Sequence, residues 1–262
     1  MLFDIMYSFN EKIKNITLKE LLTLLIALFL IYFALNELKI LNFSSVWIYF
    51  FIILFFTYKL RDCFSTFKED FRNVFAKKLL KNILIVVVLN IFISYGFLYL
   101  SGFILEAFPS LGDIVNFTIS SGYLCHSLMA VGGFIATVVV SPISEELIFR
   151  GVLFNRIKLI VPTVISILIV SLLFAAMHSY GNISAAFIFA ICMSILYLKT
   201  DNILVPIFAH FLNNLMAETI VFVDSGSILF TNGVVMGFVS ILAVISFIVI
   251  LKVIIKELNN IK

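Results

Sequence analysis

Long apolar runs alternate with short polar segments along the whole chain. The runs cover residues 21–36, 44–58, 83–105, 123–140, 161–177, 183–198, 203–223 and 233–255. A helix needs about 20 apolar residues to cross the hydrocarbon core of a bilayer, and the shorter runs reach that length with their uncharged flanks. The pattern therefore predicts an all-α fold, a polytopic transmembrane helix bundle of about eight spans.

The composition agrees with a lipid environment. Of 262 residues, 63% are hydrophobic and 13% are charged, and the mean hydropathy is +1.18, whereas soluble domains are about half apolar and a quarter charged. Strands of about 10 residues with alternating polarity, which a membrane β-barrel requires, do not occur. No linker or repeat divides the chain, so we expect one polytopic membrane domain, residues 1–262.

The positive charges indicate an orientation. With eight spans and a cytoplasmic N-terminus, 17 of the 18 Lys and Arg residues fall on the cytoplasmic side, and Lys39 alone falls outside. Cytoplasmic loops favour Lys and Arg, so both termini are predicted to be cytoplasmic, in a cell-membrane protein. No small-residue cleavage pattern follows the first run, so we expect that span to be retained.

Two further features have structural interpretations. Segment 59–81 places Phe64, Phe67, Phe71 and Phe75 three or four residues apart among charges, which fits either an amphipathic helix on the inner membrane face or a solvated connector. The three cysteines are isolated, without CxxC spacing, and favour buried bystanders over a disulfide or thiolate site. They are Cys63, Cys125 and Cys192.

Ionisable residues within the predicted spans, including the ends that extend beyond the apolar runs, are the candidates for chemistry, because such groups are costly in lipid and usually functional. They gather in three segments, 144–150, 174–178 and 210–214. Residues four apart share a helix face, so Glu146 and Arg150 are expected to form a structural ion pair. Glu145 points about 100° away and is left to face a cavity and accept a proton from water.

The same spacing places supporting groups beside each histidine. Phe174 lies one turn before His178, and Asn214 lies one turn after His210, where an imidazole and a carboxamide can both donate to an oxyanion. The two histidines also fit interhelical hydrogen-bond donors. A helix that continues through Arg150 to about Lys158 brings Glu145, His178 and His210 within roughly 10 Å in depth. We interpret His126 as structural or interfacial and leave Glu218 and Asp113 unassigned.

These segments resemble the CAAX prenyl protease and bacteriocin-processing family, known as CPBP or Abi intramembrane proteases. Its motifs EExxxR, FxxxH and HxxxN occur in order as Glu145-Glu146 with Arg150, Phe174 with His178, and His210 with Asn214. The resemblance covers residues 141–215, and the stretch 198–214 is especially similar to the third-motif region. It implies peptide-bond hydrolysis inside the membrane, with a family-like catalytic core at about 122–223.

In that reading Glu145 and His178 activate water, while His210 and Asn214 stabilise the oxyanion. No cofactor is certain. The family has also been described as metalloproteases, and Glu145, His178 and His210 could hold a divalent metal such as zinc; without an HExxH helix the metal-free reading is favoured. The implied partners are the bilayer and a membrane-associated peptide or protein, not nucleic acid.

Other functions fit parts of the pattern. Within the family, a CaaX-like tail and a bacteriocin precursor are both candidate substrates. The abundant Phe, Ile, Asn and Lys suit an AT-rich bacterial genome, and a bacterial protein seldom meets prenylated substrates, so peptide processing or self-immunity to a bacteriocin is favoured. A non-catalytic membrane scaffold or self-immunity protein would keep the fold without turnover. Intramembrane Glu and His also build proton relays in transporters, but the internal repeat with broken helices expected of a transporter is not evident.

Overall fold

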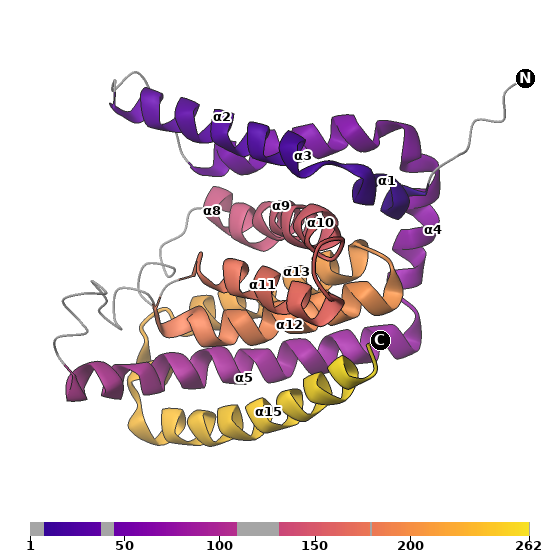
Figure 1. Cartoon of the computed structure of the whole chain (residues 1–262). Helices are drawn as coiled ribbons and strands as arrows, with labels where there is room; N and C mark the ends of the chain where they lie inside the picture. Colours follow the sequence, from indigo (N-terminus) through magenta and orange to yellow (C-terminus); the bar gives the residue numbers. More distant parts are fainter. Residues whose placement is uncertain (1–7, 38–44, 109–130, 179, 262) are drawn as a thin grey trace, which may run out of the picture.

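The computed structural model describes residues 8–37, 45–108, 131–178 and 180–261, and every regular element within these ranges is helical (Figure 1). The predictions for Lys39, Asp113, Cys125 and His126 lie outside these ranges. The longer elements are α1 (Phe9–Asn15), α2 (Leu18–Glu37), α3 (Ser45–Leu60), α4 (Phe64–Val74), α5 (Lys77–Ala107), α11 (Thr163–Ala175), α12 (Ile183–Thr200), α13 (Leu204–Val223) and α15 (Gly233–Asn259).

Six helical segments of the described chain are long and apolar enough to cross a membrane. They are Leu18–Leu35, Lys77–Ala107, Gly132–Ile157, Ile183–Thr200, Leu204–Val223 and Gly233–Asn259. The other two predicted spans correspond to α3, with 16 residues, and α11, with 13. At 1.5 Å per residue α11 extends only about 20 Å, which is short of the hydrocarbon thickness. The all-helical, multi-pass class is thus confirmed, and the higher count of eight remains a prediction.

The helices form three tiers in Figure 1. Helices α2 and α3 lie together on one side, and the long helices α5 and α15 lie side by side on the other. Between them are α11, α12, α13 and one composite helix that runs from residue 131 to 157. The main core joins the three tiers, with Phe56, Val152 and Ile250 among its buried members.

The composite helix supplies the first sequence motif. It comprises α8 (Val131–Ile135), η2 (Ala136–Val140), α9 (Ser141–Glu146), η3 (Leu147–Phe154) and α10 (Asn155–Ile157), and it continues through Arg150 as predicted. Both η2 and η3 are π-helical. Pro142 has no N–H, and its ring would meet the carbonyl four residues earlier in a regular helix. A widened turn before Pro142 is a common way to accommodate such a residue, and π-turns often occur at functional sites.

Helix α4 resolves the two readings of segment 59–81 in favour of an amphipathic helix. Phe67, Phe71 and Phe75 form a row of ring contacts along it. Phe67 packs against Phe9 of α1, and Phe75 packs against Phe208 of α13. The apolar face is therefore attached to the bundle; its position relative to a membrane surface stays a prediction.

Candidate active site

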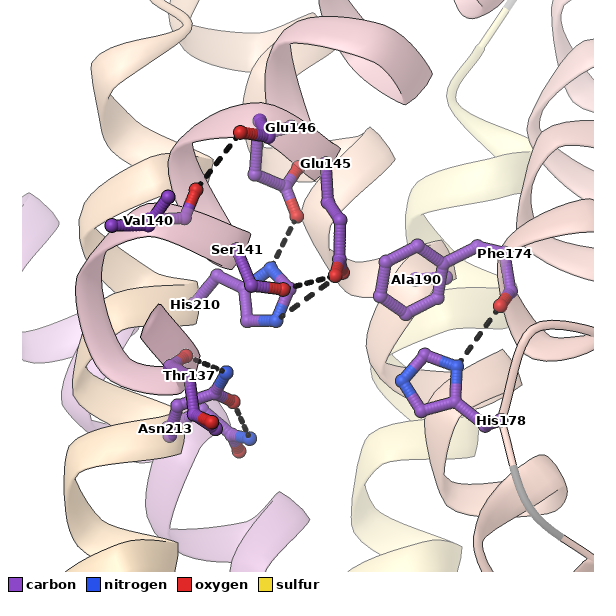
Figure 2. A network of polar contacts seen from close by, with 12 residues as sticks. Thr137, Val140, Ser141, Glu145, Glu146, Phe174, His178, Ala190, His210 and Asn213 are labelled. Atoms are coloured by element: carbon purple, nitrogen blue, oxygen red, sulfur yellow. Dashed lines mark hydrogen bonds and ion pairs between the residues drawn. The ribbon is translucent and has the colours of Figure 1, made fainter. Parts of the chain in front are cut away.

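The site is centred on two helices that bring a carboxylate pair to a histidine (Figure 2). His210 of α13 donates from Nδ1 to Oε1 of Glu146 on α9, over 2.8 Å. Its other nitrogen, Nε2, lies 4.0 Å from Oε2 of Glu145. His210 thus lies between the two neighbouring carboxylates, although 64 residues separate it from Glu146.

Glu146 also forms an ion pair with Arg150, with Nη1 3.0 Å from Oε1 and both side chains fully buried. Arg150 donates from Nη2 to the Ala190 carbonyl of α12 and lies over the Phe174 ring at 4.8 Å. A charge without a partner is very costly in such surroundings, so pairing and these further contacts are needed to keep it there. The ion pair has the predicted spacing. Glu146 is more than a structural partner of Arg150, however, because it also accepts a hydrogen bond from His210 Nδ1.

Glu145 has different neighbours. The Ser141 hydroxyl, one turn earlier on α9, donates a hydrogen bond to its Oε1. The Tyr49 side chain of α3 interacts with both Ser141 and Glu145. A backbone contact supports this approach of the two helices, since the Ser144 hydroxyl lies 3.4 Å from the Tyr49 carbonyl oxygen. Glu145 is therefore held by hydroxyl groups, whereas Glu146 is held by a guanidinium and an imidazole N–H.

His178 approaches the cluster from another side, across the Phe174 ring. Helix α11 ends at Ala175, so His178 follows the helix instead of lying within it. Its Nδ1 donates to the Phe174 carbonyl at 3.0 Å. The Phe174 ring contacts the His178 ring at 4.8 Å and the His210 ring at 5.8 Å, measured between centroids. In the neutral tautomer that this bond selects, His178 Nε2 is an acceptor.

A row of carboxamides borders the same cluster. Asn214 donates from Nδ2 to the Thr137 carbonyl of the π-helical turn η2, at 2.9 Å. Asn213 donates to Asn214 at 3.4 Å, and Asn90 of α5 donates to Asn213 at 2.9 Å. Asn214 follows His210 by one turn of α13, as expected from the spacing.

The sequence-predicted residues are therefore placed unevenly. Glu145, Glu146, Arg150 and His210 are joined by direct contacts, and His178 joins them through Phe174 and through an electrostatic interaction with Glu145. Sequence reasoning missed Ser141, Tyr49, Asn90 and Asn213. The i, i+4 spacing of Ser141 and Glu145 could have identified the first; no local spacing points to residues of α3 or α5.

A metal fits these residues poorly. Within the described ranges, no three His, Cys, Asp or Glu side chains are close enough together to hold an ion. The hypothetical ligand set of Glu145, His178 and His210 accordingly does not converge. We therefore derive no chemical step through a metal.

Comparisons with known proteins agree with the motif resemblance. Neither a curated protein nor a solved structure matched the chain. A family model described as "Rce1-like: Type II CAAX prenyl endopeptidase Rce1-like" matched residues 127–216. That range contains all three motifs, and the buried pair of Glu146 and His210 is consistent with catalytic residues of that family. Residues 127–216 therefore form a domain of the Rce1-like type II CAAX prenyl endopeptidase family.

Proposed function

We propose that the protein is an intramembrane endopeptidase that hydrolyses a membrane-associated peptide. The observation that carries the proposal is the contact of His210 with both carboxylates, at 2.8 Å to Glu146 and 4.0 Å to Glu145, inside a helix bundle. A structural role needs no second carboxylate beside the Glu146–Arg150 pair. Hydrolysis does need a general base, and Glu145 can act as one, because among the described residues the ion pair of Arg150 is made to Glu146 and not to Glu145.

In the proposed reaction, Glu145 and His178 activate a water molecule. The carboxylate accepts a proton from the water, whose oxygen attacks the scissile carbonyl. The unprotonated Nε2 of His178 offers a second acceptor for the same water. The proton then passes to the leaving amine, so that one water and one peptide bond give a carboxylic acid and an amine.

The developing oxyanion is stabilised by His210 and Asn214. His210 Nδ1 donates to Glu146, and its Nε2 can donate to the oxyanion when that nitrogen also carries a hydrogen. Asn214 uses one Nδ2 hydrogen for the Thr137 carbonyl and keeps the other for substrate. Removing one oxyanion donor typically costs about 10²- to 10³-fold in rate.

The substrate class follows from an apolar cavity beside these helices. The cavity holds about 340 Å³ and lies between α1, α3 and α4 on one side and the composite helix and α13 on the other. Its lining includes Leu147 and Phe211, which directly follow Glu146 and His210 in the sequence. Such a space suits the hydrocarbon chain of a lipidated peptide or the apolar side chains of a membrane-associated precursor.

Purified protein in lipid nanodiscs tests the proposal with three peptides: a farnesylated CaaX peptide, its unmodified counterpart and a bacteriocin precursor. Mass spectrometry identifies the cut bond, with and without a chelator. We expect Glu145→Gln to lower kcat by about 10²-fold or more. Glu218→Gln is the matched control, because Glu218 is another glutamate within the bundle, buried on α13 two turns beyond His210. Absence of cleavage by the unmodified enzyme supports a scaffold or immunity protein, and loss of cleavage with the chelator restores the metal hypothesis.

A further inference from the structure

The carboxamide row that ends at Asn214 begins outside the family-matched segment. Asn90 lies in the middle of α5 and is buried, with 3% of its surface exposed. Its Nδ2 donates to Asn213 Oδ1, Asn213 Nδ2 donates to Asn214 Oδ1, and Asn214 Nδ2 donates to the Thr137 carbonyl. Three side chains from two helices thus form one directional chain of hydrogen bonds.

The terminal carbonyl fixes the direction of this chain. A backbone carbonyl only accepts hydrogen bonds, so Asn214 must turn its NH₂ group toward Thr137. Its oxygen then faces Asn213, which must turn its own NH₂ group toward Asn214 and its oxygen toward Asn90. The orientation of Asn214 therefore fixes that of Asn213, whose oxygen then needs a donor. The NH₂ group of Asn90 supplies this donor.

The buried amide of Asn90 lowers the stability of the fold, which indicates a role other than stabilisation. Its Oδ1 is buried and has no hydrogen-bond partner among the described residues. An unsatisfied buried polar atom destabilises the folded state, because its hydrogen bonds to water are not replaced. An apolar residue of similar size would avoid that cost in a helix that is otherwise largely apolar, so retention of the amide is better explained by the hydrogen bond that it donates.

We propose that Asn90 is a positioning residue that acts through Asn213 to hold the Asn214 carboxamide with its NH₂ group toward the reacting carbonyl. This rests on the proposed role of Asn214 as an oxyanion donor. If Asn214 rotated by 180° about its amide bond axis, an oxygen would face the oxyanion and repel it. The Asn90–Asn213 bond resists that rotation, since a rotated Asn214 would present NH₂ to the NH₂ of Asn213.

The experiment compares Asn90→Leu with Tyr95→Phe. Tyr95 also lies in α5, and its hydroxyl donates to the Ala217 carbonyl of α13 at 3.0 Å. It therefore links the same two helices without joining the carboxamide row. We expect Asn90→Leu to lower kcat by about 10- to 100-fold, with KM within about twofold and thermal stability unchanged or higher. Tyr95→Phe is expected to change kcat by less than about twofold.

A second readout does not depend on activity. Solid-state NMR on protein labelled with ¹³C,¹⁵N-asparagine is expected to show side-chain contacts between Asn90 and Asn213 and between Asn213 and Asn214. The Asn214 side-chain resonances should shift in Asn90→Leu and stay unchanged in Tyr95→Phe. Unshifted Asn214 resonances, or equal loss of kcat in the two variants, would overturn the inference. If the unmodified enzyme cleaves none of the peptides while the NMR contacts appear, the proposed function fails and the positioning of Asn214 stands.

Discussion

The helix pair α5–α15 and the cluster around Glu146 both lie within the bundle, but they associate in different ways. In the pair, regular helices approach through small residues: a Cβ on Gly96 would collide with Ala243 and would lie 3.2 Å from the Ser240 Cα atom. In the cluster, charged groups converge from helices that contain two π-helical segments. The pair needs only close packing, whereas the cluster depends on each charge having a partner.

The largest effect is expected from breaking the ion pair in the cluster. Arg150→Met removes the cation and leaves the Glu146 carboxylate buried, which should destabilise the protein by about 3–5 kcal/mol. Unfolding by SDS in mixed micelles measures the change. The double variant Glu146→Gln/Arg150→Met removes both charges and should regain most of that loss. Equal stability of the single and double variants would show that the pair is not what this region depends on.

A smaller effect is expected from the α5–α15 pair. Gly96→Ala places a Cβ against Ala243 and the backbone of α15, and overpacking of this kind typically costs about 1–3 kcal/mol. The same SDS titration provides the measurement. Gly237→Ala is the matched control, because Gly237 lies in α15 with open space around its Cβ direction. A similar loss in both variants would indicate a general effect of replacing glycine, not a close helix approach.

A third test probes how strongly a hydroxyl from outside the matched segment supports the cluster. Tyr49→Phe removes the group that interacts with Ser141 and Glu145. A hydrogen bond to a charged group is worth about 1.5–3 kcal/mol. Because the Ser141 hydroxyl still donates to Glu145 in the variant, kcat should fall by about tenfold. Steady-state cleavage of the best peptide gives kcat and KM separately. Tyr58→Phe, on an exposed part of the same helix, should leave both constants unchanged; an equal fall there would argue against a specific role for Tyr49.

These comparisons also show which features the sequence could predict. Apolar run length predicted the helices, and a spacing of four placed Arg150 beside Glu146 and Asn214 beside the His210 turn, because both relations are local to one helix. The meeting of His210 with the carboxylates followed from depth arguments and from the motif resemblance. Helix geometry is enough to predict the first two contacts, and motif order together with helix depth is enough to predict the third.

Other features depend on how helices pair in three dimensions. Nothing in the spacing of α3 or α5 indicates that Tyr49 and Asn90 face α9 and α13. The length of α11 was overestimated, since it ends at Ala175 and leaves His178 in the following turn. The separation of roles between the carboxylates was also too simple, because Glu146 contacts His210 as well as Arg150. Each of these depends on contacts between residues far apart in the sequence.

The smallest expected effect is a change in the pH dependence of stability. It concerns two aspartates of the segment between α3 and α5, which, unlike the buried cluster, lie near solvent. Burial raises the pKa of Asp70, with help from Glu69. The Lys12 ammonium, 3.0 Å away, lowers the pKa of the exposed Asp62. Asp70 therefore opposes folding at neutral pH, and this opposition is relieved as pH falls through its raised pKa. Asp62 supports folding above its ordinary pKa of 3.8, and this support is lost as pH falls through its lowered one.

The unfolding free energies of Asp70→Asn and Asp62→Asn, measured from pH 7 to pH 3, should therefore change in opposite directions relative to the unmodified protein. Asp70→Asn is expected to be as stable as the unmodified protein or more stable at pH 7, and its advantage should shrink first, above pH 3.8. Asp62→Asn should be slightly less stable at pH 7, and its deficit should close only below that value. Added salt should weaken the Asp62 effect, which arises from an exposed pair, more than the Asp70 effect, which arises mainly from burial. Parallel pH profiles in the two variants would show that neither local environment sets the pH dependence.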